Sequence, residues 1–150
     1  MNPTIRRATV DDTDTLLKMM SDYYAFDGHP YEENEARAAL IGLLCEPRYG
    51  AVWLILDDAA PIGYAVLCLG YSLEYLGRDA FVDELYLVET HRRRGWGAQI
   101  LAFVENQARQ MGVRSIHLEV VRANVAANAF YRKHGYCDHD HYLMSKRLGR

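Results

Sequence analysis

The sequence lacks the marks of several protein classes. It has three cysteines, Cys45, Cys68 and Cys137, and they form no Cys-x-x-Cys pair. An odd and scattered set argues against a disulfide framework or a zinc site, and it favours a reducing compartment. The opening residues, MNPTIRRATVDD, contain no apolar core of a secretory signal, and no apolar run approaches the roughly 18 residues of a membrane-spanning helix. We therefore expect a cytoplasmic protein with no membrane partner.

Positive charge is also in short supply. The chain has 17 Lys and Arg against 20 Asp and Glu, which gives a formal net charge of −3 and a pI of about 6.0. Proteins dedicated to nucleic acids are usually basic, so we expect no nucleic-acid partner. Lysine is the scarcer cation, and the predominance of arginine suits phosphate, because its guanidinium is a permanently charged fork of donors.

Repeats, linkers and low-complexity stretches are absent as well. The chain has 150 residues, of which 50% are hydrophobic and 25% are charged. This composition is ordinary for a globular protein that is large enough to bury one core. We therefore expect a single domain over residues 1–150.

Hydrophobic periodicity and turn residues predict elements in the order β-α-α-β-β-β-α-β-α-β-β. The segment FVDELYLV is apolar with an acidic pair in its middle, and we interpret it as a buried strand interrupted at one point. Helices between strands favour an α/β (α+β) fold with a mixed sheet of about six or seven strands flanked by about four helices. The expected strands are 4–8, 51–56, 62–71, 81–88, 115–121, 136–138 and 141–146; the expected helices begin after Asp11 or Asp12 and cover 31–45, 95–112 and 124–134.

One short segment, HRRRGWGAQIL at 91–101, joins three arginines to two glycines and then becomes apolar. It lies between a predicted strand and a predicted helix, whose first turn has unpaired N–H groups that favour an anion such as pyrophosphate. Gly95 and Gly97 leave the backbone open to a phosphate, and Arg92 and Arg94 can add charged hydrogen bonds. The spacing Arg-x-x-Gly-x-Gly fits neither the P-loop nor the dinucleotide fingerprint. Alone it is a weak pattern, and a solvated basic loop that caps the helix is the alternative.

Three motifs follow one another along the second half of the chain. The strand pattern DELYL runs into Arg-x-x-Gly-x-Gly, a further strand precedes N-x-x-A at 124–127, and F-Y at 130–131 is followed by G-Y at 135–136. Together they resemble the GNAT superfamily of acetyl-CoA-dependent N-acetyltransferases. The resemblance is specific over 81–136 and looser over the whole chain. Two departures, Glu89-Thr90 at a frequent proline position and Trp96 at a small aliphatic position, remove no backbone donor.

The resemblance implies the GNAT fold, acetyl-CoA as co-substrate and no metal. In this family the strand before the loop bulges and splays from the next parallel strand, and the pantetheine arm pairs with its exposed amides like an added strand. The pyrophosphate rests on amides of the loop and helix start. The residues that match these cofactor-binding positions are Leu85, Tyr86, Leu87, Arg92, Arg93, Arg94, Gly95, Trp96, Gly97, Ala98 and Asn124.

Acetyl transfer needs a neutral amine and a donor for the departing thiolate. Tyr131 matches the family tyrosine near the cofactor sulfur, and a phenol can act there as general acid. Glu84 is our candidate to accept the amine proton, directly or through water, and Asp83 can share that role or hold a cationic substrate. Each assignment has a plain alternative: Tyr131 as a core tyrosine, and Glu84 as a structural or substrate-binding carboxylate.

The segment SDYYAFDGHPYEEN at 21–34 joins aromatic rings to carboxylates. With Asp83 and Glu84, Tyr24 and Asp27 would line an acidic, aromatic site that favours cationic amines. LGRDAFVDELYLV also looks like the polyamine and diamine acetyltransferase branch, so we expect a small cationic primary amine, such as a polyamine, a diamine or an aminoglycoside. The alternatives are a protein N-terminus or lysine as acceptor, and solvated charges with no role in binding.

Other classes of function stay open at this point. A GNAT-fold module could bind acyl-CoA without catalysis, and Arg92 to Arg94 could bind nucleic acid. His139 and His141 are too few to hold a metal. A homodimer is the family's common state and is expected here only by analogy.

Overall fold

A computed structural model describes residues 2–149 of the chain. Those residues form two compact units, one ending at Leu118 and the other beginning at Glu119. The first unit holds the sheet and helices α1 to α3, and the second holds helix α4 (Val125–Lys133). The expectation of a single domain over residues 1–150 stays a prediction.

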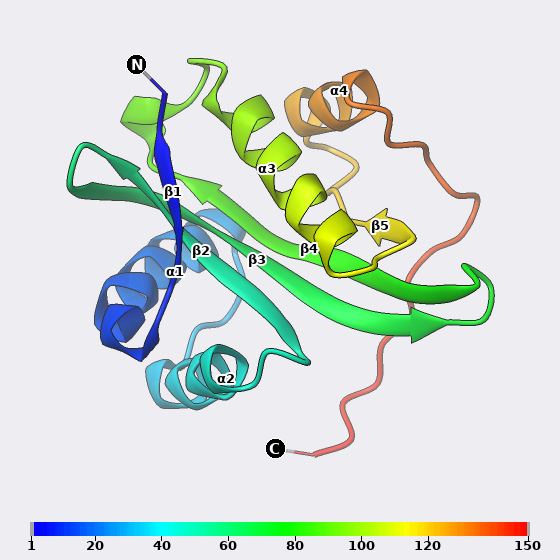
Figure 1. Ribbon diagram of the computed structural model, residues 1–150, viewed down its shortest axis with the longest axis horizontal. Helices are drawn as coiled ribbons and strands as arrows, with labels where there is room; N and C mark the ends of the chain where they lie inside the picture. The colour runs from blue at the N-terminus through cyan, green and yellow to red at the C-terminus, as the bar shows by residue number, and fades with distance from the viewer. Residues whose placement is uncertain (1, 150) are drawn as a thin grey trace. The chain divides into compact units, whose positions relative to one another are not determined.

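The elements of the first unit follow the predicted order closely (Figure 1). One-turn 3-10 helices stand at Val10–Asp12 and Glu89–His91. The helices and strands are β1 (Thr4–Arg7), α1 (Thr13–Asp27), α2 (Glu33–Cys45), β2 (Gly50–Asp57), β3 (Ala60–Ser72), β4 (Gly77–Leu87), α3 (Trp96–Gln110) and β5 (Ser115–His117).

The sheet is mixed, as predicted. Its strand order is β1-β2-β3-β4-β5, the first four strands are antiparallel, and β5 runs parallel to β4. The short turn between β2 and β3 contains Asp58 at φ 51°, a left-handed conformation that Asp tolerates in turns. The predicted hairpin over β2 and β3 is confirmed.

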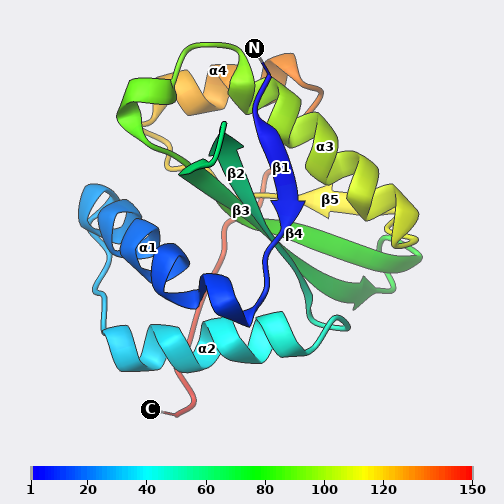
Figure 2. The ribbon, with the colours of Figure 1, turned by 60° about the vertical axis from the view of Figure 1, so that its left-hand side comes forward.

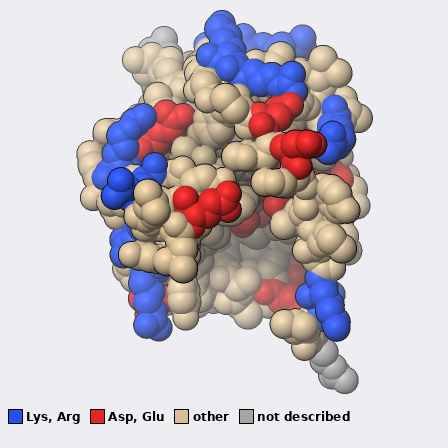
Figure 3. Space-filling view, turned by 90° about the vertical axis from the view of Figure 1, so that its right-hand side faces the viewer, with Lys and Arg blue, Asp and Glu red and all other residues tan. Residues whose placement is uncertain are grey.

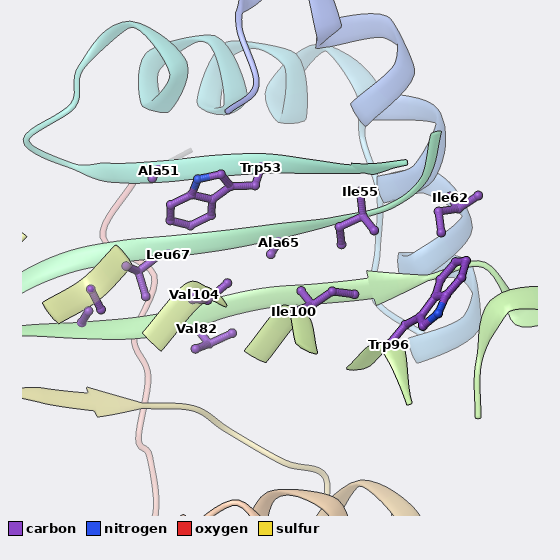
Figure 4. Close-up of a cluster of buried hydrophobic side chains, with 12 residues drawn as sticks. Ala51, Trp53, Ile55, Ile62, Ala65, Leu67, Val82, Trp96, Ile100 and Val104 are labelled. Carbon is purple, nitrogen blue, oxygen red and sulfur yellow. The ribbon is translucent and has the colours of Figure 1, made fainter. Parts of the chain in front are cut away.

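Helices cover both faces of this sheet: α1 and α2 lie on one face and α3 on the other (Figures 1 and 2). Successive side chains of a strand point to opposite faces, so β2 serves two cores. Trp53 and Ile55 pack with Ile100 of α3, as Figure 4 shows, whereas Leu54 packs with Leu16 of α1. Each fully buried side chain of this size contributes about 1.5–3 kcal/mol.

Strand β4 contains a bulge at the acidic pair. Val66 of β3 pairs with Glu84 and Leu67 pairs with Val82, so Asp83 is an extra residue without a partner in β3. The bulge changes the alternation of faces: Val82 packs in the cluster beneath α3, whereas Glu84 turns to the α1 face. The strand interruption expected from the sequence is confirmed.

Strand β5 pairs with β4 only over Asp79–Phe81 and Ser115–His117. Beyond the bulge, β4 continues to Leu87 without β5 beside it. This splay agrees with the fold that the resemblance implies. It leaves the β5-side edge of β4 free of strand pairing from Val82 onward within residues 2–149.

Three secondary-structure predictions need correction. Strand β5 ends at His117 rather than 121, because the Val121 carbonyl accepts from the Asn124 N–H (2.9 Å) in the turn before α4. Residues 136–149 contain no strand, and Tyr142 (79% exposed) and Met144 (82%) stay in solvent. Residues 2–149 thus form five strands instead of six or seven. Asp12 precedes α1, but its carboxylate accepts from the Thr9 N–H (2.9 Å) instead of capping that helix.

Candidate functional site

Glu84 is the only charged side chain that is buried among residues 2–149, with 7% of its surface exposed. The Tyr64 hydroxyl donates to Glu84 Oε2 at 2.7 Å, and the Tyr24 hydroxyl donates to Glu84 Oε1. These side chains come from β3, α1 and the bulge of β4, so three elements meet at one carboxylate. A buried carboxylate is tolerated when both oxygens accept hydrogen bonds, and this one meets that condition.

Opposing effects act on the proton affinity of Glu84. Burial raises the pKa of its carboxyl, the hydrogen bonds from Tyr24 and Tyr64 lower it, and the neighbouring charge of Asp83 raises it, with a net upward direction. Burial and the Glu84 carboxylate raise the pKa of both phenols, so each stays a protonated donor. Burial also raises the pKa of the Cys68 thiol to about 11, which leaves it inert as a nucleophile. The arrangement favours a carboxylate that can accept a proton.

Aromatic rings surround the Tyr24 end of this group. The Tyr24 ring lies 5.8 Å from the Tyr31 ring and 6.3 Å from the His29 ring, between centroids. Tyr24, Asp83 and Glu84 are therefore brought together as the sequence suggested. Asp27 is placed differently: its carboxylate lies 3.0 Å from His29 Nε2, at the end of α1.

The free edge of β4 carries backbone groups of alternating direction. The Val88 N–H donates to the Ile62 carbonyl of β3 at 2.9 Å. The backbone N–H and C=O groups of successive residues in an antiparallel strand point alternately to its two neighbours. The backbone groups of Tyr86 therefore also point toward β3, and those of Leu85 and Leu87 point toward the edge that β5 leaves open. Three residues were expected to offer backbone contacts to the cofactor. The backbone groups of Leu85 and Leu87 point to the unpaired edge, where a strand could be added, and those of Tyr86 do not.

The loop before α3 ends in an uncapped helix start. Gly95 precedes the helix at φ 79°, a left-handed conformation, and Arg93 also has a positive φ of 59°. Gly95 has no side chain to cap the helix, and no acidic residue lies in the first turn. The N–H groups of the first turn, which includes Gly97 and Ala98, thus have no partner from the helix itself. Such N–H groups suit an anion, and the pyrophosphate site expected here stays a prediction.

Arg92 does not extend toward this helix start. Its Nε donates to the Leu87 carbonyl at 2.7 Å, and its guanidinium lies 5.2 Å from the Phe26 ring centroid and 5.8 Å from that of Tyr86. Arg92 therefore fastens the loop to the end of β4 and to α1. It also uses one of the two acceptor positions of the Leu87 carbonyl.

Trp96 is buried, with 6% of its surface exposed, and belongs to the core between α3 and the sheet (Figure 4). Its side chain is thus structural, and only its backbone belongs to the anion-binding turn. The guanidinium of Arg94 lies 5.8 Å from the Trp96 ring centroid, beside the helix start.

The second unit carries the two remaining candidates. Asn124 caps α4, because its side-chain oxygen accepts from the Ala127 N–H at 3.1 Å. Its amide nitrogen is not used in this cap. Tyr131 lies on α4 with its ring against Phe130 (5.1 Å) and Tyr136 (5.7 Å), and burial raises the pKa of its phenol.

Sequence reasoning missed Tyr64. It lies inside the apolar run IGYAVLCLGY, where a tyrosine is most simply interpreted as a core residue. A weak signal was present, since a buried phenol needs a hydrogen-bond partner. Identifying Glu84 as that partner required the register of β3 against β4.

Metal-ligating clusters and membrane-spanning helices are both missing from residues 2–149. That range contains no group of three or more His, Cys, Asp or Glu side chains arranged to hold a metal ion. The rings of His139 and His141 stack with centroids 6.2 Å apart. None of the helices in that range is long and apolar enough to span a bilayer.

The profile of the acetyltransferase (GNAT) family matches residues 14–136. The uncharacterized N-acetyltransferase YycN of Bacillus subtilis is 35% identical over 75 residues, which cover 50% of this chain and 47% of that relative. The aminoalkylphosphonate N-acetyltransferase of Salmonella typhimurium is 28% identical over 151 residues, covering 96% of this chain and 90% of the relative.

The crystal structure of an integron cassette protein from the mobile metagenome of Cole Harbour Salt Marsh superposes with a TM-score of 0.86. It is 30% identical, and the match covers 97% of this chain and 91% of that one. The matched profile extends over the bulged strand, the helix start and α4. The chain therefore belongs to the acetyltransferase (GNAT) family and is an acetyl-CoA-dependent N-acetyltransferase.

Proposed function

We propose that this enzyme acetylates the primary amine of a small cationic molecule. The observation that carries the proposal is the buried Glu84 carboxylate, held by two phenols beside Asp83 at the bulge of β4. Carboxylates and tyrosine rings attract an ammonium group through charge and cation–π contact. The name of one relative, an aminoalkylphosphonate N-acetyltransferase, also points to a small amine as acceptor for that relative.

The donor, acetyl-CoA, is proposed to lie along the free edge of β4. The N–H groups of Leu85 and Leu87 would pair with the pantetheine arm, and the first turn of α3, from Gly95 to Ala98, would hold the pyrophosphate. Exposed Arg93 and Arg94 add positive charge, and Asn124 can offer its unused amide nitrogen. Holding both reactants in place would supply most of the rate.

The chemistry then divides between two side chains. Glu84 accepts a proton from the ammonium, and the freed nitrogen pair attacks the thioester carbonyl. As the C–S bond breaks, the thiolate takes a proton from the Tyr131 phenol, and the second proton lost by nitrogen restores that phenol. Coenzyme A and the N-acetylated amine leave.

Two other candidates make different predictions. A protein N-terminus or a lysine side chain would be acetylated in peptides, and a non-catalytic module would bind acetyl-CoA without thiol release. Nucleic-acid binding is the less favoured alternative: net charge is −3, and the face in Figure 3 mixes Lys and Arg with Asp and Glu. A homodimer and a cytoplasmic location stay predictions.

The test is an acceptor screen that detects free thiol and product mass. The panel contains diamines, polyamines, an aminoglycoside, an aminoalkylphosphonate and peptides with a free N-terminus or a lysine. We expect thiol release with at least one small cationic amine, a roughly 100-fold loss in Glu84→Gln, and no loss in the control Tyr71→Phe, whose side chain is exposed. Acetylation of peptides alone would overturn the assigned acceptor, and acetyl-CoA binding without any turnover would support the module.

A further inference from the structure

The two phenols that hold Glu84 differ in their exposure to solvent. Tyr64 is 0% exposed and belongs to the core between the sheet and α1. Tyr24 is only partly buried on α1, near the exposed residue His29. Each phenol binds a different oxygen of the carboxylate, so the two contacts are chemically alike but differ in access.

This asymmetry makes Tyr24 the more accessible of the two phenols that donate to Glu84. Glu84 as a whole residue is 7% exposed, and its Oε2 accepts a hydrogen bond from the buried Tyr64. Its Oε1 accepts a hydrogen bond from the partly buried Tyr24 hydroxyl. A phenol can accept a proton on its oxygen while it gives up its own, so it can act as a link in a proton chain.

We propose that the Tyr24 hydroxyl relays the amine proton to Glu84, and that Tyr64 is a positioning residue that fixes the carboxylate. The proposal rests on the function above and names the route by which its base is reached. It gives Tyr24 a step in the chemistry, in addition to the substrate contact expected from the sequence.

The step balances without any further reactant. An N–H bond of the ammonium breaks and an O–H bond forms at Tyr24 Oη, and the nitrogen keeps the electron pair. The original Tyr24 O–H bond breaks as an O–H bond forms at Glu84 Oε1. Tyr24 is a neutral phenol before and after, and Glu84 becomes a carboxylic acid that loses its proton to solvent after turnover.

The charges around Glu84 suit this role. Burial and the carboxylate raise the pKa of Tyr24, so the phenol stays protonated between transfers and does not serve as the final acceptor. The upward shift in the pKa of Glu84 brings it closer to that of an amine. The titratable groups that act on Glu84 or its two phenols from the packed elements are Tyr23 and Tyr24 of α1, Tyr64 of β3 and Asp83 of β4. The carboxylates of Asp83 and Glu84 in turn raise the pKa of Cys68 of β3.

The experiment compares Tyr24→Phe with Tyr64→Phe, which removes the same kind of hydrogen bond from the other oxygen. Glu84→Gln and the exposed Tyr71→Phe complete the set. For each variant, kcat and the KM for the best amine are measured from pH 6 to pH 10. Circular dichroism confirms that each variant is folded.

Tyr24→Phe is expected to lower kcat about 100-fold at pH 8 and to change the amine KM by only a few fold. Tyr64→Phe is expected to keep kcat within a few fold at pH 8 and to move the acidic limb of the profile to higher pH, because a hydrogen bond that lowers the pKa of Glu84 is lost. A change in KM alone for Tyr24→Phe, with Glu84→Gln still deficient, would overturn the relay and leave the proposed function standing. Full activity in Glu84→Gln would instead overturn the proposed base.

Discussion

Tyr64 of β3 and Glu84 of β4 are joined by a 2.7 Å hydrogen bond inside the core, with the phenol as donor to Oε2. Tyr64 pairs in the sheet with Tyr86, two residues beyond Glu84, so the contact is a diagonal one across the two strands. It lets a charged group occupy a site where burial alone would favour neutralisation. The fold thus holds a carboxylate with raised proton affinity next to the open edge of β4.

The free energy of unfolding of the enzyme should depend on pH through the titration of Glu84. Because burial raises the folded pKa of Glu84 above its unfolded value, protonation favours the folded state, and stability falls as pH rises between the two pKa values. Glu84→Gln lacks this titration. Its free energy of unfolding relative to wild type should therefore increase from pH 4 to pH 8, by about 1.4 kcal/mol for each pH unit that separates the folded and unfolded pKa of Glu84.

Urea denaturation at several pH values measures that difference. A difference that stays flat or decreases with rising pH would show that Glu84 is not a destabilised carboxylate in the folded protein.

Gly95 at the start of α3 should affect the binding of acetyl-CoA in addition to stabilising the left-handed turn. Gly95→Ala forces alanine into a left-handed conformation (φ 79°) without a clash, and we expect a stability loss of about 1 kcal/mol. Gly112, after the other end of α3, has φ 77° and equally open surroundings. Gly112→Ala should cost the same stability, but only Gly95→Ala should raise the KM for acetyl-CoA, by about 10-fold. An equal KM in the two variants would place the pyrophosphate elsewhere.

Gly63 controls how closely β3 approaches β4. A Cβ at this position would lie 2.3 Å from the Tyr86 carbonyl oxygen and 2.9 Å from Leu87 Cδ2. Gly63→Ala should therefore destabilise the protein by about 2–3 kcal/mol as the strands separate. Gly42 of α2 has no atom within 4 Å of such a Cβ, and Gly42→Ala should stabilise by up to about 1 kcal/mol. Thermal unfolding distinguishes the two, and a neutral Gly63→Ala would contradict the register of β3 and β4.

Tyr131 is predicted to protonate the departing thiolate. Tyr131→Phe should lower kcat about 100-fold and leave the acetyl-CoA KM within a few fold, since the ring remains. Tyr142→Phe is the matched control in the same unit, because that side chain is 79% exposed. Steady-state thiol release gives both constants. Undiminished kcat in Tyr131→Phe would remove it as the acid.

Much of the fold was accessible from the sequence, because local patterns determine it. The acidic pair within FVDELYLV predicted the interruption of β4, and the glycine pattern predicted a helix start with open amides. The alternation of apolar and polar residues in HYLMSK also predicted a strand. A strand needs a neighbouring strand for its backbone hydrogen bonds, and within residues 2–149 no strand pairs with that segment.

The candidate site was less accessible, because its contacts are distant in the sequence. The Tyr24 and Tyr64 hydroxyls reach Glu84 from positions 60 and 20 residues away. Only the register of β3 on β4 and the packing of α1 bring them together. Arg92 was misassigned for a related reason. The run of three arginines suggested that Arg92 binds phosphate, yet the Arg92 Nε donates to the backbone carbonyl of Leu87 at the end of β4.

The central claim, that Glu84 takes the proton from an ammonium substrate, is tested most directly by the rate of Glu84→Gln as a function of pH. At pH 7 the variant should acetylate the best amine about 100-fold more slowly than wild type. The deficit should shrink as pH approaches the pKa of the amine, roughly 10 for a primary alkyl ammonium, because solvent then supplies the neutral nucleophile. A deficit that is constant across this range, or absent at pH 7, would contradict the assignment.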